Sequence, residues 1–314
     1  MTPSAHAASP PRRAGPVRKP PAWMQSPLLY TFLAASMLYL LVFIGLPIVY
    51  TLVMSVQDVT LANIADLIRP YVGLDNYRAA LDDPSFAKVL VDSVVFVGVN
   101  VIGQVGIGLA AALFFAQRFP GAHFLRGLLL SSWILPALVV GALWRWIFAT
   151  EYGVANYLLA GLGLIGSPIH WLSDPAVALS SVTIANIWFG TPFSMILIAA
   201  GLTGIPEEQY EAAALDGAGP VARFNHITLP ALWPTLLAVS CLVTIYTMRA
   251  FDLIFAMTQG GPLDASNVLP LLSYQLSFQR FHFGIGAAVG STTFVIVIAV
   301  ALVYVRTLRG EARE

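Results

Sequence analysis

Six long apolar stretches constrain this chain more than any other feature of its sequence. A helix needs about 20 mostly apolar residues to cross about 30 Å of hydrocarbon, and each stretch is at least that long. Because the bilayer interior holds no water, a crossing segment must satisfy its own backbone hydrogen bonds, which a helix does. The stretches cover residues 28–56, 89–115, 127–149, 177–202, 231–257 and 284–305. The sequence therefore predicts an all-α integral membrane protein with six transmembrane helices.

Composition agrees with that class and excludes others. Of 314 residues, 58% are hydrophobic and 10% charged, whereas a soluble domain carries about 25% charged residues. The formal net charge of zero gives no indication of a nucleic-acid partner. The single cysteine, Cys241, lies in an apolar stretch, and the five histidines lack the spacing of metal ligands. We expect no nucleic-acid partner, no metal and no cofactor.

The two ends of the chain have polar compositions. Residues 1–27 carry four basic residues, no acidic residue and many prolines, a composition that resists folding. The apolar stretch that follows is much longer than the roughly 7–15 residues of a signal-peptide core, so we expect it to remain as a membrane anchor. The predicted organisation is a disordered tail at 1–27, a six-span membrane domain at 28–305 and a second tail at 306–314.

The distribution of Lys and Arg predicts the orientation, because cytoplasmic loops carry an excess of them. If the N-terminus is inside, the inner segments hold most of the basic residues: Arg12, Arg13, Arg18, Lys19, Arg118, Arg126, Arg223, Arg306, Arg309 and Arg313. The outer segments hold Arg69, Arg78, Lys88 and Arg280. We therefore expect both termini in the cytoplasm, together with the polar segment between the fourth and fifth stretches.

That polar segment, residues 205–230, has helix signals of its own. The Ile-Pro-Glu-Glu sequence at 205–208 predicts a helix start, since proline is favoured at the first position and acidic residues in the first turn. Gly217 should end this helix, because glycine adopts the left-handed cap readily. Pro220 can begin a second short helix, which we expect to end at Pro230. The prediction is a helix–glycine–helix elbow.

The same segment carries a recognisable motif. It consists of Glu-Ala-Ala at 211–213, Gly217 and, after nine intervening residues, Ile-x-Leu-Pro at 227–230. These elements resemble the signature loop of ATP-binding-cassette (ABC) importer permeases. The resemblance implies a type I ABC importer permease fold in a bacterial cytoplasmic membrane, with a loop that docks onto an ATPase. It assigns ATPase coupling to Glu211, Ala212, Ala213, Asp216, Gly217 and Phe224. The alternative is a merely solvated amphipathic connector.

Three further segments indicate a branch of that family. They are Gly-Leu-Asp-Asn-Tyr at 73–77, Asn-Ile-Trp-Phe-Gly-Thr-Pro-Phe at 186–193, and Phe-Asp-Leu-Ile at 251–254 running into Thr-Gln-Gly-Gly-Pro at 258–262. They resemble carbohydrate-uptake permeases of the maltose type, and the Gly-Gly-Pro element resembles the first of the two paired permeases. The resemblance implies a second six-span permease, two copies of a P-loop ATPase, an extracytoplasmic solute-binding protein and a sugar substrate.

The resemblance also implies a set of substrate-binding residues. Asn186, Phe189, Gly190 and Phe193 match the family's fourth-span motif, with Tyr246 and Thr247 from the fifth span. There the family's asparagines correspond to Thr247 and Ala250, a departure that leaves the identity of the sugar open. An amide can bind hydroxyls while an aromatic ring covers the apolar face of a sugar. Asn186 could instead form an interhelical hydrogen bond, worth about 0.6–2 kcal/mol.

Two charged residues of the fifth stretch need a partner or water, because a lone charge in a membrane is costly. Arg249 and Asp252 are three residues apart, so on one helical face they would neutralise each other. The alternative is a role in gating the outer mouth.

Other motifs and functions receive less support. The sequence G-x-G-x-x-G at 161–166 has no strand–turn–helix context, and the chain has no G-x-x-x-x-G-K-[ST]. We therefore expect ATP hydrolysis on a partner chain, and no enzymatic activity here. The alternatives are a self-contained secondary transporter, a membrane-embedded enzyme, and an ABC permease for a non-sugar solute such as an amino acid or oxyanion.

Overall fold

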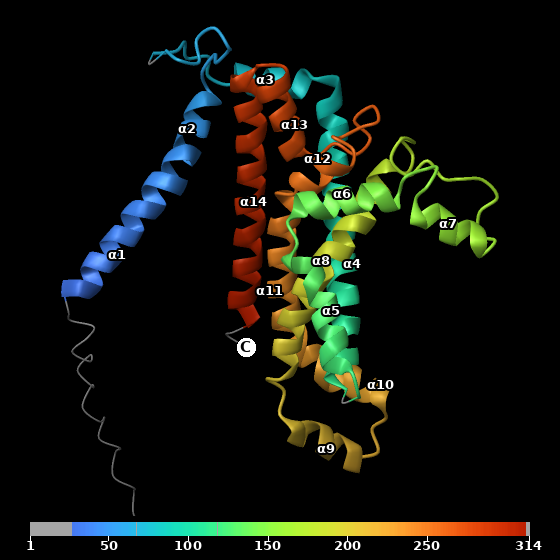
Figure 1. The fold of residues 1–314 in the computed structure, drawn as a ribbon. Helices are drawn as coiled ribbons and strands as arrows, with labels where there is room; N and C mark the ends of the chain where they lie inside the picture. Colours follow the sequence, from blue (N-terminus) through green and yellow to red (C-terminus); the bar gives the residue numbers. More distant parts are fainter. Residues whose placement is uncertain (1–26, 67, 118, 312–314) are drawn as a thin grey trace, which may run out of the picture. The chain divides into compact units, whose positions relative to one another are not determined.

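The computed structural model describes residues 27–66, 68–117 and 119–311, which form a mostly helical structure (Figure 1). The predicted tail at 1–27 lies outside the described residues except for Pro27, and so do the last three residues of the chain. By their internal contacts the residues divide into two units, Met1–Tyr50 and Thr51–Glu314. Each unit is described by itself.

The first unit contains the first apolar helix. It consists of α1 (Pro27–Leu40), a π-helical turn η2 (Leu41–Gly45) and the start of α2 (Leu46–Met54). The Leu46 N–H donates to the Leu41 carbonyl, five residues earlier, directly before Pro47. A proline lacks the N–H and crowds the carbonyl four residues earlier. The wider π turn accommodates Pro47, so the helix continues through it.

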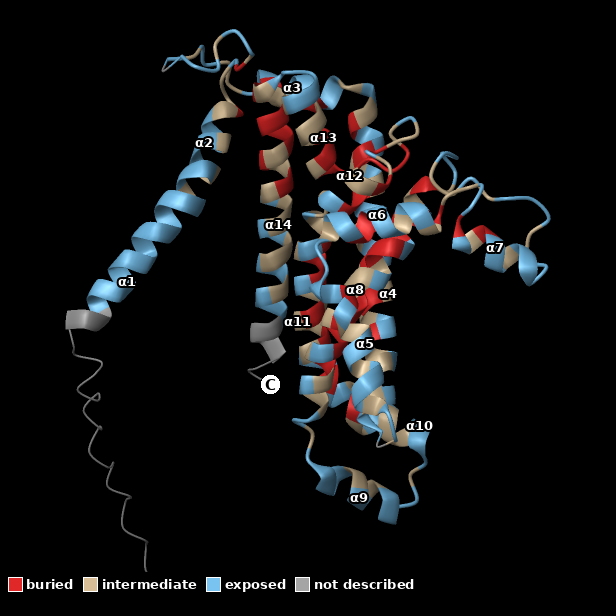
Figure 2. Ribbon diagram, viewed as in Figure 1, coloured by how far each residue is buried: buried red, intermediate tan, exposed pale blue. Residues whose placement is uncertain are grey.

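The second unit contains the remaining helices. They are α3 (Asp75–Asp82), α4 (Pro84–Ala116), α5 (Ala122–Ile134), α6 (Ala137–Ile147), α7 (Val154–Gly161), α8 (Ala178–Leu202), α9 (Glu207–Leu215), α10 (Pro220–Arg223), the π turn η3 (Phe224–Thr228), α11 (Leu229–Met248), α12 (Asp252–Met257), α13 (Leu269–Tyr274), the π turn η4 (Gln275–Gln279) and α14 (Phe283–Glu311). At the centre, α4 packs along α8 and α11. Buried residues gather along α4, α8 and α13, whereas α9 is largely exposed (Figure 2).

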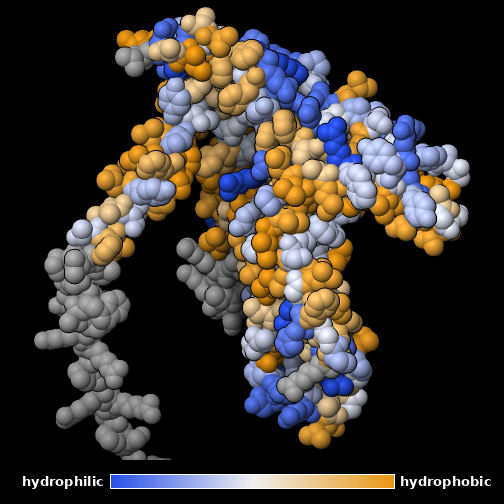
Figure 3. All heavy atoms as spheres, viewed as in Figure 1, coloured by the Kyte–Doolittle hydropathy of each residue, from blue (hydrophilic) through white to orange (hydrophobic). Residues whose placement is uncertain are grey.

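Most of the predicted spans are present as helices. Among the described residues, five helices are long and apolar enough to cross a membrane: Tyr30–Met54, Pro84–Ala116, Ala178–Leu202, Pro220–Met248 and Phe283–Thr307. They correspond to the first, second, fourth, fifth and sixth predicted spans. On the face that Figure 3 shows, hydrophobic residues cover much of the middle of the second unit, and hydrophilic residues are conspicuous near its two ends. This pattern suits a bundle that crosses a bilayer.

The third predicted span is not one straight helix. Residues 127–149 fall on α5 and α6, which are bent by 104° at the short break between them. Leu135, in the break, is extended with φ −68° and ψ 143°. The following residue is Pro136, which disfavours a helical conformation in the residue before it. By length and composition, the described residues contain five candidate spans, or six when this bent pair is taken as one broken span.

The fifth predicted span also differs from expectation at both ends. The helix that begins at Pro220 does not end at Pro230, because the π turn η3 joins it to α11. The Leu229 N–H donates to the Phe224 carbonyl directly before Pro230, which is the arrangement found before Pro47. At the other end α11 stops at Met248, and α12 begins only at Asp252. Residues 231–257 are therefore two helices with a break at 249–251.

Candidate functional site

A pocket of about 310 Å³ lies in the second unit, beside the break between α11 and α12. Gln104 of α4 and Trp133 of α5 line it, together with residues of α8, α11 and the break. All six residues predicted to bind substrate lie in its wall: Asn186, Phe189, Gly190, Phe193, Tyr246 and Thr247. The structure thus brings together side chains of α8 and α11 that are more than fifty positions apart in the sequence.

Aromatic rings form one wall of the pocket. The Phe193 ring stacks on Trp133, with centroids 5.4 Å apart and an interplanar angle of 26°. On its other side Phe193 meets Tyr246 edge to face, also with centroids 5.4 Å apart. Tyr246 is 60% exposed, so neighbouring side chains leave much of it free to contact a bound molecule. Such a row offers flat apolar surface and one phenolic hydroxyl to a bound molecule.

Two amide side chains, those of Asn186 and Gln104, supply polar groups to the pocket lining. Asn186 is buried, and its Nδ2 donates to Asn100 Oδ1 at 2.7 Å. The Gln104 Nε2 donates to the Asn186 backbone carbonyl at 3.1 Å and to Asn100 Oδ1 at 3.2 Å. The interhelical hydrogen bond considered for Asn186 is therefore present. Asn186 still lines the pocket, and among the described residues nothing donates to its Oδ1.

Sequence reasoning missed two members of this amide network, Asn100 and Gln104, of which only Gln104 lines the pocket. Both belong to α4, four residues apart, and both are buried within the apolar middle of that helix. Polar groups in a membrane span are rare and usually face the interior or a cavity. Their i, i+4 spacing inside the second apolar stretch was the signal that would have found them.

Gly190 leaves room for the Gln104 amide. A Cβ atom at position 190 would lie 2.0 Å from Gln104 Oε1, which is far inside contact distance. The absence of a side chain therefore lets α4 and α8 approach each other at this point. Gly190 also lines the pocket, so the same glycine shapes both the helix contact and the wall.

Arg249 and Asp252 do not neutralise each other. No ion pair joins them among the described residues. The expectation that they share a helical face is wrong, because α11 ends at Met248 and α12 begins at Asp252. Both side chains are exposed and both line the pocket. The pocket lining therefore includes one cation and one anion that are available to a bound molecule.

The loop between α8 and α11 forms an exposed elbow. Its helix α9 begins at Glu207, and Gly217 follows it with φ +77°, as predicted. The Ala218 N–H donates to the Ala213 carbonyl, and the Gly217 N–H to the Ala214 carbonyl. This is the Schellman pattern of helix termination, which needs the left-handed residue that glycine supplies.

The predicted coupling residues lie on this elbow. Glu211, Ala212, Asp216 and Gly217 are exposed, while Ala213 and Phe224 are half-buried. The Tyr210 hydroxyl hydrogen-bonds to Thr228 Oγ1 at 3.0 Å and ties α9 to η3. Leu215, at the end of α9, is 90% exposed. One hydrogen bond therefore holds α9 to η3, and the end of α9 exposes an apolar side chain.

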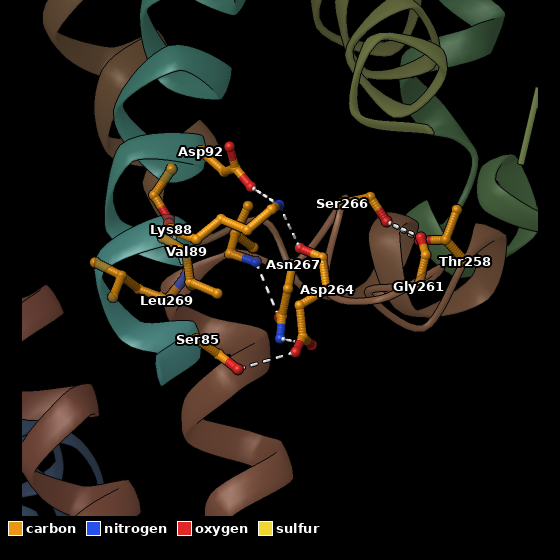
Figure 4. Close-up of polar contacts among 12 residues, drawn as sticks. Ser85, Lys88, Val89, Asp92, Thr258, Gly261, Asp264, Ser266, Asn267 and Leu269 are labelled. Atoms are coloured by element: carbon orange, nitrogen blue, oxygen red, sulfur yellow. Dashed lines mark hydrogen bonds and ion pairs between the residues drawn. The ribbon is translucent and has the colours of Figure 1, made fainter. Parts of the chain in front are cut away.

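At the opposite end of the second unit, the loop between α12 and α13 is held by side-chain hydrogen bonds (Figure 4). Asp264 accepts from Ser85 at Oδ2 and from Asn267 at Oδ1, with distances of 3.1 and 2.9 Å. The Asp264 backbone carbonyl accepts from Lys88 Nζ at 3.0 Å. Ser266 Oγ donates to the Gly261 carbonyl at 2.6 Å. These contacts anchor the Gly-Gly-Pro segment to the start of α4.

These features define a class of protein. Membrane-length helices surround a pocket lined by aromatic, amide and charged groups, and an exposed elbow projects from one end. Among the described residues, no cluster of His, Cys, Asp or Glu side chains is placed to hold a metal. The class is a multi-pass membrane component of a transport system.

The chain belongs to the family of binding-protein-dependent transport system inner membrane components, whose family model matches residues 104–309. It is 36% identical to the trehalose/maltose transport system permease protein MalF of Thermococcus litoralis, over 91% of this chain and 95% of that protein. It is 32% identical to the diacetylchitobiose uptake system permease protein DasB of Streptomyces coelicolor, over 90% of this chain and 86% of that protein.

A solved structure has the same fold. It is the crystal structure of a bacterial ABC transporter involved in the import of the acidic polysaccharide alginate, with a TM-score of 0.78 and 19% identity. The match covers 92% of this chain and 97% of that chain. The predicted family, the all-α integral membrane class and the type I ABC importer permease fold are confirmed. The chain is a membrane permease component and not itself an enzyme.

Proposed function

We propose that this chain is a permease subunit of an ATP-driven ABC importer for a carbohydrate, and that it forms half of the translocation pore. The cargo class is a di- or oligosaccharide or a related sugar. The observation that carries the proposal is the convergence of Asn186, Phe189, Gly190, Phe193, Tyr246 and Thr247 on one pocket. Relatives named for trehalose/maltose transport and diacetylchitobiose uptake support the same class.

The chemistry of the pocket suits a sugar. Each sugar ring has a C–H face that packs on an aromatic ring and a rim of hydroxyls that hydrogen-bond. The Trp133–Phe193–Tyr246 row supplies the first kind of contact. Asn186, Thr247, Arg249 and Asp252 supply polar groups for the second. Because the two charges have opposite sign, the pocket has no charge excess that would select an ionic cargo.

The elbow at 205–230 is proposed to couple the pore to an ATPase. The elbow offers a surface that a groove on a partner can bury. That surface combines the small side chains of Ala212 and Ala213, the charges of Glu211 and Asp216, and exposed Leu215. The left-handed Gly217 and half-buried Phe224 give the elbow a defined shape. The chain contains no P-loop sequence, so ATP hydrolysis is assigned to a partner.

The proposed assembly has two copies of that ATPase, a second six-span permease and an extracytoplasmic solute-binding protein. Both termini and the elbow then lie in the cytoplasm, as the distribution of Lys and Arg supports. The Gly-Gly-Pro loop lies on the outer side and supports placement of this chain as the first of the paired permeases.

Two measurements test the proposal. The tagged chain, purified in mild detergent from its host, should bring down a P-loop ATPase and a second permease in stoichiometric amounts. Deleting the chain should abolish energy-dependent uptake of a labelled sugar. Uptake that survives deletion of the ATPase would instead indicate a self-contained transporter, and loss of amino-acid or oxyanion uptake alone would overturn the sugar assignment.

A further inference from the structure

We infer that Gln104 is a specificity-determining residue, and that its Oε1 is a fixed hydrogen-bond acceptor that selects cargo with a hydroxyl donor at that position. The inference rests on the proposed function, in which the pocket holds a sugar. It adds a contact from α4, a helix to which the sequence assigned no substrate-binding residue. It also states what chemistry the contact requires of the cargo.

The orientation of the amide network is determined by a backbone carbonyl. The Phe96 carbonyl can only accept a hydrogen bond, and Asn100 Nδ2 donates to it at 2.8 Å. Asn100 must therefore present its Oδ1 to the neighbouring amides. Asn186 Nδ2 donates to that oxygen at 2.7 Å. Because the Phe96 carbonyl cannot donate, it fixes the orientation of the Asn100 amide and, through Asn100 Oδ1, that of the Asn186 amide.

A second backbone carbonyl determines the orientation of Gln104. The Asn186 carbonyl accepts from Gln104 Nε2 at 3.1 Å, and Asn100 Oδ1 accepts from the same nitrogen at 3.2 Å. A carboxamide nitrogen has two hydrogens, so its donor capacity is used. Among the described residues nothing donates to Gln104 Oε1. Gln104 is 4% exposed and lines the pocket.

The position of Oε1 is set by Gly190. Because a Cβ at residue 190 would lie 2.0 Å from this oxygen, Oε1 lies directly over the glycine backbone. Gly190 is itself part of the pocket wall, between Asn186 and Phe193 on α8. The whole Gln104 amide lies against Gly190, since the same Cβ would be 2.4 Å from Cδ and 2.8 Å from Nε2. Because the Nε2 hydrogens are already donated to Asn186 and Asn100, Oε1 is the group of this amide that is left for a molecule in the pocket.

An acceptor in the pocket lining that receives no donor from the protein discriminates between cargo molecules. A hydroxyl can donate to Oε1, whereas a fluorine, an ether oxygen or a carboxylate cannot. Sites built to hydrogen-bond one group reject analogues that lack it, because the protein group is then left unpaired. A deoxyfluoro sugar is a suitable probe, since fluorine resembles the hydroxyl in size but cannot donate.

The test uses cells that express the complete transporter. Uptake of labelled maltose, trehalose and N,N′-diacetylchitobiose first identifies an accepted sugar. Rates are then measured for its monodeoxyfluoro analogues, at concentrations that saturate the binding protein, in the parent strain and with Gln104→Met. The binding protein is the same in both strains, so its own preferences cancel in the ratio. Thr191→Val is the matched control, because Thr191 is buried on α8 but does not line the pocket.

In the parent and in Thr191→Val, fluorine at one hydroxyl should lower uptake by about 2- to 13-fold, the range for one net hydrogen bond. In Gln104→Met that difference should disappear at this hydroxyl and persist at the others. If Gln104→Met keeps the parental ratio at every position, Gln104 only packs, whatever the total rate. If the parent strain discriminates against fluorine at no hydroxyl of an accepted sugar, this inference fails and the proposed function stands. If deleting the chain abolishes uptake of no sugar, the proposed function fails and this inference fails with it.

Discussion

Asn186 of α8 donates from its amide nitrogen to Oδ1 of Asn100 on α4 at 2.7 Å. The two residues are 86 positions apart, and the bond lies in the bundle interior beside the pocket. Asn186 lines the pocket and Asn100 does not. This difference separates a packing contribution from a substrate contribution, because a variant at either position breaks the same bond.

We expect Asn186→Ala to lower the free energy of unfolding by about 0.6–2 kcal/mol, the range for an interhelical hydrogen bond. Asn100→Ala should lower it by at least as much, because Asn100 also bonds to Phe96 and Gln104. Only Asn186→Ala should also raise the KM for sugar uptake markedly, because only that side chain reaches the pocket. Thermal unfolding of the purified complex and uptake kinetics measure the two effects. Equal changes in KM for both variants would assign Asn186 to packing alone.

Gly217→Val should uncouple the transporter. Residue 217 has φ +77°, and a left-handed conformation costs about 1–2 kcal/mol for a residue with a Cβ. No atom lies within 4 Å of an added Cβ, so the effect is conformational and not steric. The variant should insert and assemble but lose transport-coupled ATPase activity, measured in proteoliposomes.

Gly219→Ala is the matched control for that elbow. Gly219 has φ −72° and equally open surroundings, so alanine should leave ATPase activity near the parental value. Normal sugar uptake by Gly217→Val would remove the elbow from the coupling mechanism.

Gly190→Ala should damage the pocket directly. The added Cβ would lie 2.0 Å from Gln104 Oε1, and overpacking of this kind costs about 1–3 kcal/mol. We expect a lower unfolding temperature together with loss of sugar uptake. Gly106→Ala on α4, where a Cβ meets no atom within 4 Å of this chain, should preserve both. Parental uptake by Gly190→Ala would show that Gln104 can move aside without consequence.

Leu215→Asp should weaken the attachment of the ATPase. Burial of one leucine stabilises an interface by about 1.5–3 kcal/mol, so we expect the affinity to fall by about 10- to 100-fold. Co-purification of the ATPase at graded detergent concentrations measures the change. Leu263→Asp is the control, because Leu263 is 86% exposed and lies on the loop at the other end of the second unit. Undiminished ATPase recovery with Leu215→Asp would exclude this side chain from the interface.

Much of the fold was predictable because membrane insertion depends on local sequence. Length and hydropathy located the spans, and the elbow's glycine was recognisable because a left-handed helix end strongly favours that residue.

The prolines were harder to interpret. Pro136 marks a 104° bend, whereas Pro47 and Pro230 each follow a π turn and lie within helices that continue. A proline removes one hydrogen bond in every case, and the surrounding backbone decides how the helix responds.

By itself, then, the sequence determined the membrane class, most of the spans and the family. These depend on local hydropathy, helix signals and short motifs. The six residues that it predicts to bind substrate line one pocket, and their role stays a prediction. Only the tertiary structure decided that Arg249 and Asp252 lie at a helix break and, among the described residues, form no ion pair with each other, and that Asn100 and Gln104 of α4 meet Asn186. Such contacts depend on which faces of distant helices pack together. The packing follows from side-chain fit across the bundle, which no local pattern in the sequence encodes.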